Sequence, residues 1–340
     1  MKKRVIMLST FALATAFTSH VFAQKAPAAS SKFYLKASGG YFFSVTPGQF
    51  PDVGQFPPHD VRREVDPATG ATTTLSEKVL TGSYGQGARG GLTFGWNINQ
   101  YIGIEATFNY FRSSKNLMTK QLTTRKGTSQ VLGDVASHGY AQAIDFMPSI
   151  VLNPGFAKLN PYVRFGAVLP LWGNLNIETD ALVSGTATLP GVGAVLTRTN
   201  IHREERIKPS PTIGFQGALG ATYPISRKLD IFLEMEYRNV PVKGKEKEVK
   251  VFDQTTTFLS PTTGQPIPNV PQQKRGLNDL STAERNTEYV TTIDQNSNTP
   301  TGQNASGGTN YKDNNRPANE LKSYINIGGL GFNAGLRFRL

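Results

Sequence analysis

Hydrophobic and polar residues alternate with a period of two in eight segments of this chain. Such a period places successive side chains on opposite faces of a β-strand, and runs of about ten alternating residues are typical of strands that cross a membrane at a tilt. The alternation therefore predicts eight strands, at residues 32–43, 84–96, 102–112, 140–152, 162–175, 212–223, 229–239 and 323–340.

The connections between these segments alternate in length. Residues 97–100, 153–158 and 224–228 are short turns, whereas the long polar connections cover about 44–83, 113–139, 176–211 and 240–322. Short periplasmic turns, long outer loops and an even strand number are typical of bacterial outer-membrane barrels. We expect an all-β fold, a closed eight-stranded antiparallel up-and-down transmembrane β-barrel with long extracellular loops, and a monomer.

Two of the long connections carry further signals. Residues 190–193 read Pro-Gly-Val-Gly between Thr- and Val-containing arms, which predicts a hairpin that continues the fifth and sixth strands outward. Residues 272–319 are rich in Asn, Thr, Gly, Gln and Asp and poor in aromatic residues. We expect this segment to be mobile and exposed, because it has little apolar surface to bury.

One face of each predicted strand is apolar, and its aromatic residues fall at the two ends. This distribution predicts two aromatic girdles at the membrane interfaces. Gln142 departs from the pattern on the fourth strand, and the eighth strand changes parity at Gly328 and Gly329, where we expect a bulge. The outer girdle would contain Tyr41, Phe43, Tyr84, Tyr110, Tyr140 and Tyr237, and the inner one Phe33, Trp96, Tyr223 and Phe338.

A soluble β-sandwich also has alternating strands. Its second faces would be solvated with charges favoured at rims and turns, whereas here many charges lie in mid-strand on the polar face. The inward set predicted by parity consists of Lys36, Arg89, Glu105, Asp145, Arg164, Asp230, Glu234, Glu236, Arg238, Arg337 and Arg339. Because an eight-stranded barrel has room only for its own side chains, we expect a plugged lumen with salt bridges, in which Arg337 and Arg339 pair with carboxylates such as Glu234 and Glu236. A hydrophilic passage lined by the same residues is the alternative.

Both ends of the chain indicate export to the outer membrane. Lys2, Lys3 and Arg4 precede an apolar run, and Ala23 stands at a position suited to cleavage, so residues 1–23 are predicted to be a cleaved signal peptide and residues 24–340 the barrel. The final strand ends with Leu336, Phe338 and Leu340 on one face. Terminal residues of this kind are the expected insertion signal for the barrel-insertion machinery, after delivery by periplasmic chaperones.

Composition narrows the possible partners and chemistry. The chain has no cysteine, 38% hydrophobic residues, a formal charge of +12 and a pI near 9.7. A basic pI can indicate nucleic-acid binding, but these cations are dispersed along strands and loops. We therefore expect no nucleic-acid partner, and contacts with outer-membrane lipid and lipopolysaccharide instead.

An enzyme would need an activated nucleophile or a general base near the outer rim. The predicted mature chain has three histidines, His59, His138 and His202. Ser137 and His138 are adjacent, and so would point to opposite faces of a strand. Since no metal-ligand spacing and no glycine-rich phosphate motif is present, we expect no catalytic, metal or cofactor site.

Cations on the outward faces are candidates for lipopolysaccharide binding. If the register of the seventh strand continues past Pro241, then Lys243, Lys245 and Lys247 project outward above the outer girdle, and Arg112 at the top of the third strand adds to them. This position is level with the lipid headgroups, and ammonium and guanidinium groups bind the phosphates found there. An ordinary charged strand in water is the alternative.

Residues 96–105, 224–230 and 335–340 resemble the small outer-membrane β-barrel family that includes the transmembrane domain of outer membrane protein A and the OmpX- and OmpW-like proteins. The family often ends in Phe, whereas this chain ends in Leu340 with Phe338 two residues earlier. The resemblance implies a Gram-negative cell-surface protein with structural, adhesive or small-solute roles. We expect structural or adhesive display of large loops to an extracellular or host ligand; a narrow porin-like channel for small or hydrophobic solutes is the alternative, and a surface lipid-modifying enzyme or protease is a third.

Overall fold

The computed structural model describes residues 31–340, with the exception of residues 46, 55 and 304–307. The predicted signal peptide, residues 1–23, lies outside the described residues.

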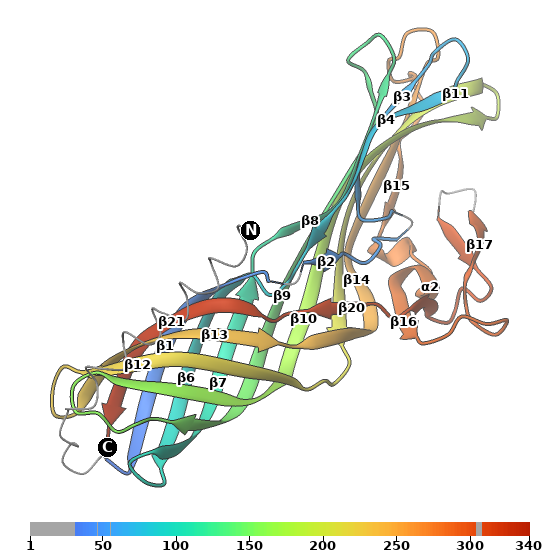
Figure 1. The fold of residues 1–340 in the computed structure, drawn as a ribbon. Helices are drawn as coiled ribbons and strands as arrows, with labels where there is room; N and C mark the ends of the chain where they lie inside the picture. The colour runs from blue at the N-terminus through green and yellow to red at the C-terminus, as the bar shows by residue number, and fades with distance from the viewer. Residues whose placement is uncertain (1–30, 46, 55, 304–307) are drawn as a thin grey trace, which may run out of the picture.

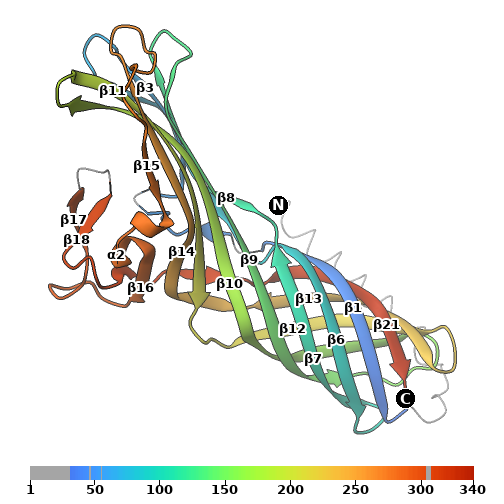
Figure 2. The same ribbon diagram turned by 180° about the vertical axis from the view of Figure 1, so that it is seen from behind.

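Eight antiparallel strands close into a barrel (Figures 1 and 2). The ring closes because the last strand pairs with the first, with Tyr34 opposite Arg339 and Phe43 opposite Leu330. Each of the eight predicted segments coincides with one ring strand, which confirms the strand number and order. In ring order the strands are β1 (Phe33–Phe43), β6 (Gly87–Asn97), β7 (Ile102–Ser113), β9 (Val131–Leu152), β10 (Asn160–Leu189), β12 (Gly214–Pro224), β13 (Leu229–Asn239) and β21 (Gly329–Arg339).

The same sheet continues beyond one end of the barrel as a tall extension (Figure 1). Strands β9 and β10 run on past the ring and pair there with strands from the long connections, so segments predicted as loops are largely strand. The hairpin predicted at residues 190–193 is confirmed as the tip between β10 and β11. The added strands are β3 (His59–Val65), β4 (Thr72–Val79), β8 (Asn116–Arg125), β11 (Gly193–Pro209) and β14 (Pro241–Leu259), with a separate pair β2 (Gly48–Gln49) and β5 (Thr81–Gly82).

Residues 272–303 and 308–319 form short regular elements in a lateral subdomain beside this extension (Figure 2), where composition predicted none. Asn298, 1% exposed, donates to the carbonyls of Asp313, Arg316 and Pro317. These contacts hold the segment through hydrogen bonds, which composition does not reveal. The elements here are β15 (Gln273–Gly276), η1 (Leu277–Asp279), α2 (Thr282–Arg285), β16 (Asn286–Val290), β17 (Pro300–Gln303), β18 (Thr309–Tyr311) and β19 (Ala318–Leu321), and β20 (Tyr324–Asn326) leads back to the ring.

Burial alternates along the ring strands as the sequence predicts. In β13, Leu233 and Met235 are exposed on the outer face, whereas Glu234 and Glu236 are buried inside. Tyr84 is an exception to the predicted outer girdle, because it precedes the start of β6 and lies 1% exposed with its ring 5.3 Å from that of Phe50.

The two departures from alternation have structural explanations. Gln142 accepts a hydrogen bond from the Tyr110 hydroxyl, at 3.3 Å, on the outer face. The parity change near Gly328 is a break between β20 and β21 and not a bulge within one strand. A Cβ on Gly328 would lie 2.2 Å from the carbonyl oxygen of Arg238, so the close approach at this break requires glycine.

Among the residues that the structure describes, no helix is long and apolar enough to cross a membrane.

The barrel wall also depends on a close contact at Gly335 in β21. A Cβ there would lie 1.9 Å from the carbonyl oxygen of Ala37 and 2.9 Å from the Phe232 ring. We expect Gly335→Ala to lower the free energy of unfolding by about 1–3 kcal/mol, as overpacking does, in urea titrations of the detergent-solubilised protein. Gly217→Ala is the matched control, because nothing lies within 4 Å of its added methyl group. Equal stability of the two variants would contradict this packing.

Candidate functional site: the barrel interior and a gap in its wall

The inner end of the lumen is organised around Asp230, whose carboxylate is fully buried. Arg337 Nε donates to Asp230 Oδ2 at 2.6 Å, and Arg339 donates to both oxygens of the same carboxylate. The expectation that these arginines pair with Glu234 and Glu236 is wrong. In the β13–β21 register, Asp230 stands directly opposite Arg337, whereas Asn333 stands opposite Glu234.

Arg164 occupies the middle of the lumen between three carboxylates. Its Nη2 lies 2.5 Å from Glu234 Oε1 and 3.0 Å from Glu236 Oε2, and its Nε lies 3.7 Å from Glu105 Oε2. Lys36 extends from β1, and its Nζ lies 3.1 Å from Glu105 Oε1. One guanidinium therefore joins carboxylates of two strands, β7 and β13.

Tyrosine and asparagine side chains donate further hydrogen bonds to these carboxylates. The hydroxyls of Tyr34 and Tyr162 donate to Glu105 and Glu234 at 2.9 and 2.7 Å, respectively. The Asn333 amide donates to Glu234 and Glu236. Buried carboxylates need such partners, because desolvation costs several kcal/mol per ion.

The outer part of the charged network contains two arginines around Asp145. Arg238 Nη1 lies 3.6 Å and Arg89 Nη1 3.8 Å from Asp145 Oδ2, and Arg238 also bonds Glu236. The Arg89 guanidinium stacks 3.9 Å from the Phe111 ring centroid. All eleven residues of the inward set predicted from the sequence thus lie in ion pairs, and only Arg337 and Arg339, at the inner mouth, are partly exposed.

Little space remains among these side chains. Two cavities within the network, one beside Tyr34 and one beside Asn109, have volumes of about 10 Å³ each. A volume of that size accommodates about one water molecule. The middle of the lumen is therefore filled by its own side chains.

A hydrophobic cluster closes the lumen beyond the charged network. Phe50 and Val53, from the first long connection, pack there with Tyr84, Phe111 and Met118, all of them buried. The alternation of polar and apolar residues does not predict this plug. Phe50 and Val53 are apolar, but they are two of several apolar residues in this connection, and nothing in their spacing shows that they fold back into the barrel.

The barrel wall has a gap on one side of β10. Pairing of β10 with β12 ends at Val168–Gly214, and pairing with β11 begins at Leu175–Ile207. Between these points no described strand pairs with this edge of β10. The connection that follows β11 turns away toward β14 instead, where Ser210 N donates to Lys243 O at 2.8 Å.

Prolines account for this gap. Pro170 in β10, Pro209 at the end of β11 and Pro211 two residues later have no N–H group, so they cannot donate to a ladder and are suited to unpaired edges. A bulge at Leu171 shifts the β9–β10 register between Pro170 and Trp172. The local sequence thus prevents the two edges from joining.

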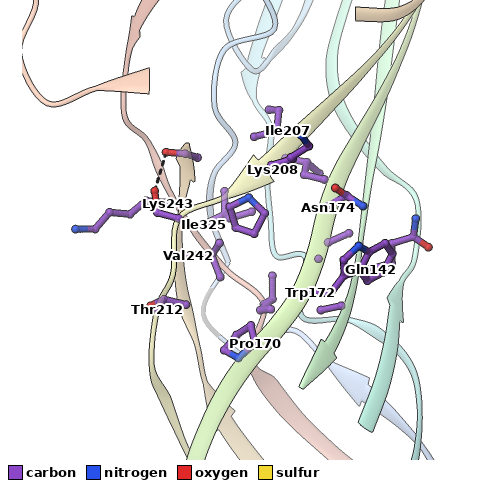
Figure 3. Close-up of a pocket in the computed structure, with 18 of the residues that line it drawn as sticks. Gln142, Pro170, Trp172, Asn174, Ile207, Lys208, Thr212, Val242, Lys243 and Ile325 are labelled. Carbon is purple, nitrogen blue, oxygen red and sulfur yellow. Dashed lines mark hydrogen bonds between the residues drawn. The ribbon is translucent and has the colours of Figure 1, made fainter. Parts of the chain in front are cut away.

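The gap opens into an apolar pocket of about 470 Å³ (Figure 3). Its inner wall consists of buried side chains that also belong to the hydrophobic cluster of the lumen, among them Leu175, Ile207, Val242 and Ile327. Trp172 and Lys243 also line it, and the Lys243 side chain extends away from the other labelled residues (Figure 3). Sequence alternation could not reveal this pocket, because it depends on strands that fail to pair.

Three of the four candidate lipopolysaccharide contacts are exposed, and the fourth is buried. Lys243 and Lys245 are exposed, and Arg112 is exposed with its guanidinium 5.1 Å from the Tyr140 ring. The outward placement of Lys247 is wrong, because the β11–β14 register shifts between Lys208 and Pro209 and reverses the parity beyond Lys245.

Lys247 is instead 7% exposed, with its Nζ 2.8 Å from Glu320 and 3.7 Å from Glu205. Burial alone would lower the pKa of Lys247, but these carboxylates outweigh burial and raise that pKa above its usual range.

The three histidines that the structure describes, His59, His138 and His202, form no catalytic arrangement with a serine. Ser137 is fully buried and exchanges a 2.8 Å hydrogen bond with Thr179, whereas His138 is exposed on the opposite face of β9. His59 and His202 pair with Glu77 and Asp180. Within the described part of the chain, no group of three or more histidine or acidic side chains is arranged to hold a metal ion.

Comparison with known proteins adds no family: no family model and no curated protein matches the chain.

The ion pairs of the lumen predict a large effect of Arg164→Met. This substitution would leave Glu234, Glu236 and Glu105 buried without their shared cation, and we expect a loss of about 3–5 kcal/mol in the free energy of unfolding. Lys115→Gln is the control, since it removes an exposed pair with Glu178 and should change stability little. Denaturant titration in detergent measures both. A loss near zero for Arg164→Met would mean that water fills the lumen.

Proposed function

We propose that this protein is an outer-membrane β-barrel that anchors a tall β-sheet extension and its lateral subdomain at the cell surface, and that it belongs with the small barrels of the outer membrane protein A, OmpX and OmpW type. The belt of apolar side chains around the ring supports the membrane location. Leu92, Phe108, Leu219, Leu233 and Phe332 are each more than half exposed on five different ring strands. Exposed apolar area of this extent needs lipid or a partner to cover it.

The filled lumen is the observation that favours surface display of the extension over transport of a solute through the barrel. A solute would have to displace the pairs around Arg164 and then the hydrophobic plug around Phe50 and Tyr84. Breaking buried ion pairs costs several kcal/mol each. A narrow porin-like channel is therefore the less favoured proposal, and the separated faces of Ser137 and His138 argue against a surface hydrolase.

The proposal also assigns partners. Leu336, Phe338 and Leu340 are exposed on the outer face at the end of the chain, where barrel-insertion machinery and periplasmic chaperones would bind them. The extension presents edge strands and an exposed tip to an extracellular or host ligand. Lipopolysaccharide would surround the outer end of the ring.

Single-cysteine labelling tests this topology, because the chain has no cysteine of its own. Val192→Cys places a thiol at the exposed tip of the β10–β11 hairpin, and Ala157→Cys places one in the exposed turn at the other end of the barrel. In intact cells a membrane-impermeant maleimide should label Cys at 192 and leave position 157 unlabelled. After cell lysis both should react. Labelling of position 157 in intact cells, with position 192 protected, would refute the proposed orientation.

A further inference from the structure

The gap beside β10, between its pairing with β12 and its pairing with β11, coincides with an apolar pocket on the outward surface. Its floor is formed by Ile207 and Val242, 9% and 6% exposed, with Ile325 beside them (Figure 3). The volume of about 470 Å³ lies within the roughly 300–1,000 Å³ of small-ligand sites. The pocket is therefore a cleft large enough for a chain-like apolar ligand.

The height of the gap on the barrel matches the outer aromatic girdle. Trp172 stands in register with Ile144 of β9, and Ile144 stands in register with Tyr110 of β7. Trp172 is 47% and its neighbour Leu171 61% exposed on the outer face. Tryptophan and tyrosine favour the boundary between lipid headgroups and hydrocarbon, so the pocket would open at that boundary.

Cations flank the apolar opening. Lys208 and Lys243 line the pocket and are exposed, and Arg206 lies one row farther out on β11. Lys208 pairs with Glu246 at 2.7 Å, and the Lys243 ammonium lies 4.9 Å from the Tyr324 ring. An apolar cleft with two exposed lysine residues beside its opening matches a ligand that has an anionic head and a hydrocarbon tail.

We propose that this gap is a lateral binding site for one hydrocarbon chain of an anionic membrane lipid. The chain enters between Trp172 and Thr212 and packs against Ile207 and Val242, and the lipid phosphate accepts hydrogen bonds from Lys208 and Lys243. This inference rests on the proposed membrane location. The lipid also covers the backbone edges of β10 that no strand covers, which in hydrocarbon would otherwise be costly.

The two tryptophans of the chain, Trp96 and Trp172, provide a direct assay. Trp96 is 41% exposed near the opposite end of the barrel, away from the pocket. In the Trp96→Phe protein, reconstituted in phosphatidylcholine vesicles, brominated phosphatidylglycerol should quench Trp172 fluorescence to a plateau at low mole fraction. Brominated phosphatidylcholine should quench it only in proportion to its mole fraction. The Trp172→Phe protein is the matched control, in which Trp96 should respond alike to both lipids.

Two further variants separate the parts of the site. Val242→Phe fills the pocket and should remove the plateau. The combined variant Lys208→Gln and Lys243→Gln changes only exposed side chains, and should weaken the apparent affinity for the brominated anionic lipid about 5-fold to 30-fold, since each cation near a membrane surface contributes about 1 kcal/mol.

Other outcomes overturn the inference. Proportional, headgroup-independent quenching of Trp172 would mean ordinary bilayer contact without a site. A plateau that persists with both lysines replaced and with either headgroup would mean an apolar cleft that does not select anionic lipid. If neither Trp96 nor Trp172 is quenched by any brominated lipid, the protein is not inserted, and the proposed membrane location fails with the inference.

Discussion

Pairing of buried charge is the constraint on which the barrel depends. The lumen holds six cations and five carboxylates from the inward set, and ions taken out of water without partners would cost more than the fold can supply. Arg164 shows how the cost is met, because its guanidinium contacts carboxylates of β7 and β13 at once. The network therefore joins strands across the lumen as well as filling it, and makes the barrel wall and its contents one unit.

The rest of the architecture follows from where the regular ring stops. β9 and β10 continue past the hydrophobic plug as part of the extension. Shifts of register there change which side chains of a strand point inward. The register shift near Lys208 turns Lys247 inward, into a pair with Glu205 and Glu320. The bulge at Leu171 and the prolines around the gap leave one edge of β10 without a partner strand, and the apolar pocket lies beside that edge.

Sequence periodicity predicted the ring well, because one buried and one exposed face fix the parity of every strand. It identified the inward charges for the same reason. It could not identify partners, since these depend on register between strands: Arg337 and Arg339 meet Asp230 and not Glu234. Composition also did not predict the short regular elements within residues 272–303 and 308–319, which hydrogen bonds such as those of Asn298 hold in place of apolar burial. Phe50 and Tyr84 were missed or misplaced because they lie outside the ring strands.

The central claim is that the lumen is closed by its own side chains, and electrical conductance tests it most directly. The full chain would be reconstituted in planar bilayers, with insertion verified by protease protection of the barrel in vesicles of the same composition. A closed lumen should give no discrete conductance steps above those of the protein-free bilayer at neutral pH. Stable, reproducible single-channel steps from the inserted protein would contradict it.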